Sequence, residues 1–211
     1  GTAADTDNYS SPPLNANLSG LSEISDNYFY GGSAGVNGGI YLVTGLKATA
    51  GTTGNTTSTA DSASNYSAVV TFALTPATTG LRPIYVGKSI EARGTGNISV
   101  LVPTGCEAGD LLVLALSGRS AVPALPDGWT NIATHNHTDK TFNRTCYKIA
   151  ASSEGAATVI DSGVYTAGVM LLFKDSDTTN PINASGTSVD DGTTFVAAGV
   201  TTTVDKCLVV H

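Results

Sequence analysis

The sequence predicts an all-β protein: an antiparallel β-sandwich, jelly-roll or immunoglobulin-like, built from internally duplicated half-units. Three observations support this prediction. Short apolar or alternating runs recur along the 211 residues and are separated by turns rich in Gly and Pro. Helix-forming residues are sparse, and no long 3.6-residue periodicity occurs. Two segments far apart in the chain repeat the same order of residues, which is typical of a duplicated unit.

The clearest fold signal lies in residues 98–132. An alternating run over 98–102 ends at Pro103, and a glycine-bearing turn leads to the dense apolar run 111–116. This run is apolar on both faces, as expected for a central strand that is covered on both sides. A loop with two prolines, Pro123 and Pro126, then reaches Trp129, the only tryptophan, which we expect to plug the core.

The remaining strands are expected from shorter β-branched or apolar runs. They are placed at 40–46, 66–74, 84–86, 146–150, 158–160, 165–173, 195–200 and 207–210. Four polar or glycine-rich stretches separate them. We expect a solvated loop at 1–20, a long loop or a threonine-rich strand with its turn at 47–64, a turn region at 90–96, and a polar loop at 131–143.

The internal repeat is visible residue by residue. Residues 66–84 read YSAVVTFALTPATTGLRPI, and residues 165–182 read YTAGVMLLFKDSDTTNPI. Upstream, Tyr41-Leu-Val matches Tyr147-Lys-Ile, and Leu21-Ser-Glu-Ile matches Trp129-Thr-Asn-Ile. The first copy lacks the two strands that open the second copy, whereas the end of the chain repeats such a pair.

We therefore expect residues 1–84 to be an incomplete first unit and 85–211 a second one, with the C-terminal strands at 195–211 available for complementation. The missing strands are supplied by the same molecule, by a neighbouring copy, or by a longer repetitive polypeptide of which this chain is one period. An exposed apolar strand is an aggregation hazard, so some partner is expected. The assembly residues would be Val204, Cys207, Leu208, Val209 and Val210.

Charge and composition limit the partners and the location. The net charge of −7 and the isoelectric point near 4.7 disfavour nucleic acids and anionic membranes as partners. No apolar stretch is long enough for a transmembrane span. Low charge with many Ser and Thr residues suits a virion or extracellular surface, where copies of the chain itself are the expected partner.

Several phrases resemble a β-sandwich domain of bacteriophage tail fibres and other virion appendages. They are VPTGCEAGDLLVLAL at 102–116, PDGWTNI at 126–132, DTTNPI at 177–182 and TTTVDKCLVV at 201–210. The resemblance covers residues 84–211 well and residues 1–83 only through the repeat. It implies a structural or adhesive role, without catalytic residues or cofactors to carry over.

The residues themselves also predict no catalytic site, since no G-x-S-x-G elbow or phosphate-binding glycine loop occurs. His135 and His137 spell a nuclease-like word with Asn136, but we expect solvated loop residues; on a strand, the two could share a metal. Four carboxylates are expected to form turns, with calcium binding between subunits as the alternative: Asp175, Asp177, Asp190 and Asp191. Three cysteines, Cys106, Cys146 and Cys207, allow at most one internal disulfide.

Two other functions remain open from the sequence. A module that binds cell-surface carbohydrate would use Trp129, Tyr28 and Tyr30 for stacking, and an accessory domain of a secreted hydrolase would need a deep pocket with paired carboxylates. Asn-x-Ser/Thr sequons could carry glycans in a glycosylating host. The candidates are Asn8, Asn17, Asn55, Asn136, Asn143 and Asn183, whereas Asn65 and Asn97 adjoin expected strands.

Overall fold

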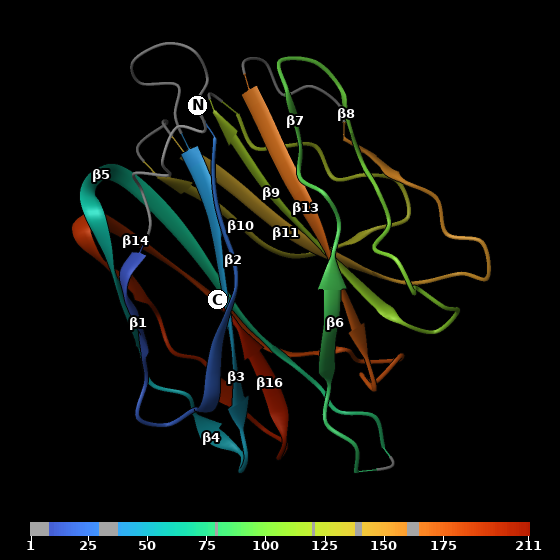
Figure 1. Ribbon diagram of the computed structural model, residues 1–211. Coiled ribbons are helices and arrows are strands. Elements are labelled where there is room, and N and C mark those ends of the chain that lie inside the picture. Colours follow the sequence, from blue (N-terminus) through green and yellow to red (C-terminus); the bar gives the residue numbers. More distant parts are fainter. Residues whose placement is uncertain (1–8, 30–37, 79, 120, 138–140, 160–164) are drawn as a thin grey trace.

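Two six-stranded antiparallel sheets face each other across a shared apolar layer, which confirms the predicted all-β sandwich (Figure 1). The computed structural model describes residues 9–29, 38–78, 80–119, 121–137, 141–159 and 165–211. No helix occurs in these residues, so none of them forms a helical span that could cross a membrane.

We call the two sheets sheet I and sheet II. Sheet I contains β1 (Tyr9–Leu14), β2 (Ser19–Phe29), β3 (Gly38–Lys47), β5 (Thr56–Leu74), β14 (Ile182–Ala197) and β16 (Cys207–Val210). Sheet II contains β6 (Ile84–Lys88), β7 (Ala92–Gly94), β9 (Leu111–Arg119), β10 (Thr130–His137), β11 (Thr141–Ile149) and β13 (Tyr165–Lys174). Two short ribbons complete the fold, namely β4 (Gly51–Thr52) with β15 (Thr201–Thr202) and β8 (Ile98–Val100) with β12 (Ala157–Val159).

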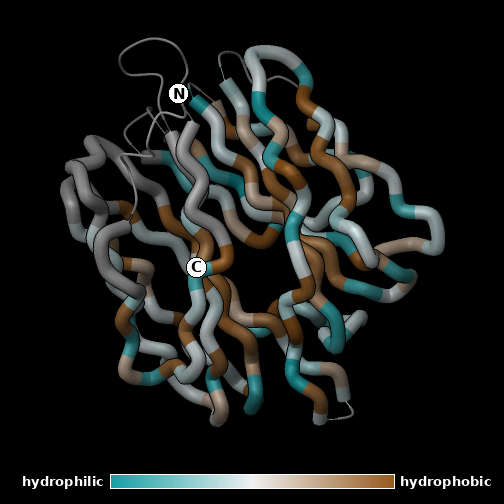
Figure 2. The backbone as a smooth tube through the Cα atoms, viewed as in Figure 1, coloured by the Kyte–Doolittle hydropathy of each residue, from teal (hydrophilic) through white to brown (hydrophobic). Residues whose placement is uncertain are grey.

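The apolar layer between the sheets follows from the period of two in a strand, which sends alternate side chains to opposite faces. Phe72 and Leu74 of β5 meet Val113 of β9 and Leu171 and Phe173 of β13 in this layer. Hydrophobic segments accordingly concentrate along the strands in the middle of the molecule (Figure 2). The predicted central strand at 111–116 is confirmed, since its first four residues are fully buried.

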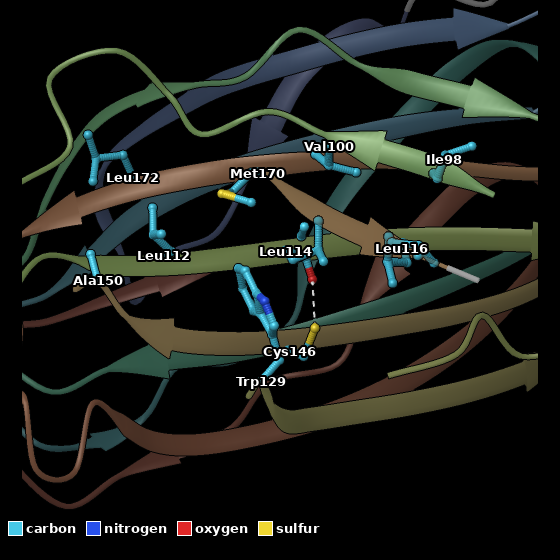
Figure 3. Packing of buried hydrophobic residues seen from close by; sticks show 12 residues of the cluster. Ile98, Val100, Leu112, Leu114, Leu116, Trp129, Cys146, Ala150, Met170 and Leu172 are labelled. Atoms are coloured by element: carbon cyan, nitrogen blue, oxygen red, sulfur yellow. Dashed lines mark hydrogen bonds between the residues drawn. The ribbon is translucent and has the colours of Figure 1, made fainter. Parts of the chain in front are cut away.

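The outer face of each sheet is also covered. The β8–β12 ribbon supplies Ile98, Val100 and Val159 to a second core against Leu114 and Met170 of sheet II (Figure 3). On sheet I, residues before β2 and β15 do the same with a smaller set of side chains: Leu18 and Val200 pack against Ala73, Cys207 and Val209. Both sheets are therefore buried on both faces, which explains why their central strands are apolar throughout.

The two sheets repeat one strand order, as the internal duplication predicts. Sheet II runs β10-β11-β9-β13-β6, and sheet I runs β2-β3-β16-β5-β14, with β1 pairing the first part of β5. Leu208 faces Leu74 just as Leu111 faces Phe173, so β16 is the counterpart of β9. One half of the sandwich is thus assembled from both ends of the chain.

Irregularities in the pairing are repeated as well. An extra residue bulges from β2 at Ile24 and from β10 at Ile132, and another from β14 at Asn183 and from β6 at Val86. Bulges change strand direction at defined positions and do not recur in register by accident. The proposed match of Leu21-Ser-Glu-Ile with Trp129-Thr-Asn-Ile is therefore confirmed, because both bulges fall on its last residue.

The connections after β5 and β13 cross each other at the centre of the duplication. The amide of Ala77 donates to Asp175 O (2.9 Å), and the amide of Asp177 donates to Thr75 O (2.9 Å). Pro76 and Ser176 pair across this crossing. Each connection carries the chain from one sheet to the edge strand of the other sheet.

Several stretches expected as loops or turns contain strands instead. β1 lies within residues 1–20, β10 and β11 occupy most of 131–143, β7 lies within 90–96, and β14 begins at Ile182 instead of 195. In the threonine-rich stretch 47–64, the strand alternative is correct from Thr56 onward. Except for β11, which pairs with β10 and β9, these strands lie at sheet edges or in ribbons, where one face meets water and polar residues are tolerated.

β5 and β14 form a long ribbon that curls over the outer face of sheet I (Figure 1). The contacts of His211, which follows β16, show that β5 is curled. Its ring contacts two hydroxyls of the same strand, with Thr56 Oγ1 2.8 Å from Nε2 and Thr71 Oγ1 3.0 Å from Nδ1. A straight strand would hold these threonines far apart, so β5 must double back.

Candidate functional site: a polar recess beside Trp129

Trp129 is positioned by a tight turn at 126–128. Its amide donates to Pro126 O (3.2 Å), and Gly128 has the positive φ of 78° that this turn requires. The indole is 8% exposed and packs with Leu114, Cys146 and Met170 (Figure 3). Trp129 is therefore a core residue, as expected, and only part of its surface reaches the outside.

That surface borders a recess of about 220 Å³ on the outer side of sheet II. Three parts of the chain converge on it: the turn at 126–127, Lys148 of β11, and residues 154–158, which lead into β12. Lys148 Nζ lies 2.6 Å from Glu154 Oε1, with side-chain exposures of 29% and 9%. The recess is therefore mainly polar: it combines a half-buried ion pair with a small exposed part of Trp129.

Glu154 is fixed by more than its lysine. Its second oxygen, Oε2, accepts a hydrogen bond from the amide of Ala151 (3.0 Å). Burial by itself would raise the pKa of Glu154, but the hydrogen bonds from Lys148 and the Ala151 amide outweigh burial and lower the pKa. The carboxylate is thus ionised near neutral pH and holds Lys148 in place.

In the other half of the sandwich, apolar side chains occupy the position that corresponds to this recess. Val209 faces Gly45 as Leu112 faces Lys148, so Gly45 is the counterpart of Lys148. A Cβ at Gly45 would lie 3.0 Å from Leu21 Cδ2 and 3.1 Å from Leu18 Cβ. The fold thus fills this place with leucines in one half and leaves a charged recess in the other.

Four of the five predicted assembly residues, 207–210, lie between β3 and β5 of the same chain. Cys207, Val209 and Val210 are fully buried and Leu208 is partly buried, whereas Val204 in the preceding turn is 37% exposed. The backbone of β16 pairs on both sides, with β3 from Lys47 to Thr44 and with β5 from Leu74 to Phe72. These residues are therefore the interior of sheet I in a single molecule.

The histidine and carboxylate candidates lie on separate elements. His135 and His137 lie on β10 and not in a loop, which corrects that expectation. Asp177 forms a turn, since its Oδ1 accepts from the amides of Thr179 (2.7 Å) and Asn180 (2.8 Å). Asp175 itself has a positive φ of 58° in the connection after β13. Asp190 and Asp191 lie on β14 and not in a turn, and only their backbone is described. In the described part of the chain, no three His, Cys, Asp or Glu side chains are placed to hold a metal ion.

All three cysteines are free thiols, so the disulfide alternative is excluded in this structure. Burial raises the pKa of Cys146 to about 12 and that of Cys207 to about 11. Burial also raises the pKa of Cys106. Because the thiolate is the reactive form, these environments do not favour nucleophilic chemistry near neutral pH.

The aromatic and glycosylation candidates are scattered. Tyr28 lies on β2 opposite Gly39, with only its backbone described, and Tyr30 and Asn8 lie outside the described residues. Exposed sequon asparagines are Asn17, Asn55 and Asn136. Asn143 is half-buried between β10 and β9, and Asn183 is engaged by Thr203 through both its amide atoms (3.0 and 2.8 Å). A glycan therefore fits best at the three exposed positions.

Sequence reasoning missed Lys148 and Glu154. The available signal was a charged residue at an outward position of a strand, between Cys146 and Ala150, followed by a glutamate in the next turn. Comparison of the chain with protein-family models, with curated proteins and with solved structures gives no match.

Proposed function

We propose that the chain is a non-catalytic structural subunit of a virion fibre or another extracellular filament, whose copies join head to tail by exchanging C-terminal strands. The observation that supports this most is the position of β16. This strand of four residues completes sheet I from the far end of the chain and is buried between β3 and β5.

An exchanged strand makes the same contacts as an unexchanged one. β16 follows an exposed turn at 203–206, and the neighbouring strands offer it backbone pairing on two sides. When this turn opens, β16 of one copy can occupy the slot of the next copy without any new interface having to evolve. Repetition of that step produces an open chain of subunits.

A cysteine placed opposite Cys207 tests this proposal. Lys47 is the register partner of Cys207, so Lys47→Cys brings two thiols to facing positions. The background carries Cys106→Ser, which removes the more exposed thiol. After refolding under oxidising conditions at increasing protein concentration, we expect covalent dimers and longer chains on a non-reducing gel.

The matched control is Lys47→Ser in the same background, which should give no ladder. Exchange also predicts that electron microscopy of the unmodified protein shows filaments at the concentrations that give the ladder. Bridged monomers alone at every concentration would show that β16 stays in its own chain and would overturn the proposal.

A further inference from the structure

We propose that the recess beside Trp129 binds a single ring of a neutral sugar. This inference goes beyond the structural role proposed above and does not depend on it. It rests on three features of the recess: its convergence of elements, its absence from the other half of the sandwich, and the balance of its charges.

The recess is built from three separate elements. Asp127 comes from the turn before β10, Lys148 from β11, and Glu154 and Thr158 from the segment that enters β12. Its volume of about 220 Å³ is of the size of one pyranose ring. Convergence of polar groups from separate elements on one concave surface is a feature of small-molecule sites.

The fold does not require this recess. At the equivalent place on sheet I, Leu18 and Leu21 lie against Gly45, where a Cβ would meet them at 3.0–3.1 Å. The duplicated half thus serves as an internal control. It shows that apolar side chains can fill this place, whereas the Trp129 half keeps an ion pair that is costly to bury.

The charges of the recess select a neutral, hydroxyl-rich ligand. Lys148 supplies one positive charge, and Glu154 and Asp127 supply two negative charges, so an anion is disfavoured. Hydroxyl groups can donate to the exposed carboxylate of Asp127 and accept from the ammonium of Lys148. The small exposed part of Trp129 offers a limited apolar contact beside these polar groups.

Trp129 provides a direct measurement, because it is the only tryptophan and borders the recess. The full-length chain is titrated with the methyl glycosides of glucose, galactose, mannose and N-acetylglucosamine, and indole fluorescence is recorded. We expect a saturable change with at least one of them. Lys148→Met should weaken the binding by about tenfold, since it removes a charged donor.

A second ion pair supplies the control. Lys174 Nζ lies 2.6 Å from Glu107 Oε2 on a different part of sheet II and does not line the recess. Lys174→Met should leave the titration unchanged. Glu154→Gln retains an acceptor for the Ala151 amide, so it should keep the fold, as judged by circular dichroism, while weakening the binding.

Two results would overturn the proposal. One is the absence of a saturable change with all four glycosides in the unmodified chain. The other is a change of equal affinity in the unmodified chain, in Lys148→Met and in Lys174→Met, which would place the effect outside the recess.

Discussion

At the scale of single residues, His211 makes the stability of the protein depend on pH. The ring is 7% exposed and lies between the hydroxyls of Thr56 and Thr71. Burial lowers its pKa from 6.5 to about 4. Between these values the unfolded chain binds a proton that the folded chain does not, so stability rises with pH across this window.

We therefore expect the free energy of unfolding to be constant above about pH 7 and to fall between about pH 6.5 and pH 4, by an amount on the order of 3 kcal/mol. Urea unfolding at a series of pH values measures this slope. His211→Leu, which introduces the residue found at the equivalent position 114, should remove the slope in this window. An equal slope in the variant would assign the pH dependence to other groups.

The residue scale also shows what the sequence could predict about the site. Trp129 was predictable as a core residue, because a single tryptophan after a Pro-Asp-Gly turn and before a strand has an apolar surface to enter. The role of Lys148 was not predictable, because its significance depends on Glu154, Asp127 and an empty position that only the folded chain brings together.

At the scale of elements, we expect β16 to be a strand that can be removed and supplied again. A chain shortened to residues 1–206 leaves the pairing edges of β3 and β5 open, together with the apolar surface that Val209 and Val210 cover. We expect this chain to bind a labelled peptide of residues 203–211, because the peptide restores both ladders and the buried contacts. Fluorescence anisotropy of the peptide measures the binding.

A peptide with Val209→Asp provides the control, since a buried, unpaired charge in the outer core of sheet I should abolish binding. Equal binding of the two peptides would indicate a non-specific association with exposed apolar surface. No binding of the native peptide would argue that β16 enters the slot only while the rest of the chain folds.

The elements that sequence reasoning missed share a physical cause. β10 and the first part of β5 are polar because they lie at an edge or in the curled ribbon, where alternation between apolar and polar residues is weak. Central strands such as β9 and β13 were predictable because burial on both faces leaves an unbroken apolar run. Local sequence therefore reports burial more reliably than it reports strand pairing.

At the scale of the whole molecule, the two halves should unfold as one unit. Phe72 and Leu74 of sheet I share a core with Leu171 and Phe173 of sheet II, and the connections after β5 and β13 hydrogen-bond to each other. We expect one cooperative transition. Trp129 fluorescence, which reports sheet II, and far-ultraviolet circular dichroism, which reports both sheets, should give the same urea midpoint.

Separate midpoints would mean that the half built from the two ends of the chain unfolds independently. Calorimetry distinguishes the cases without a spectroscopic probe, because a single transition requires equal calorimetric and van't Hoff enthalpies. Removal of the tryptophan signal by Trp129→Phe should leave the calorimetric ratio unchanged, which makes this variant a useful control.

The sequence predicted the order of the duplicated segments, but it did not predict the residue-by-residue correspondence in each of them. The match of 66–74 with 165–173 and that of Leu21 with Trp129 agree with the strand pairing. The match of Tyr41 with Tyr147 is displaced by three residues, because Thr44 is the true counterpart of Tyr147. The sequence match paired the two tyrosines because they are identical, although the residue opposite Tyr147 in the other half is the polar Thr44.

The crossed connections also determine which part of the chain could be exchanged as one piece. Residues 84–174 form sheet II as one continuous stretch, and the two flanking segments meet where the amide of Thr75 donates to Pro181 O (2.8 Å). Because its two ends lie side by side, this stretch could be exchanged as a single segment of the chain. A replacement has to keep the side chains that sheet II packs against sheet I, whereas the outer face that carries the recess beside Trp129 can change without altering the slot of β16.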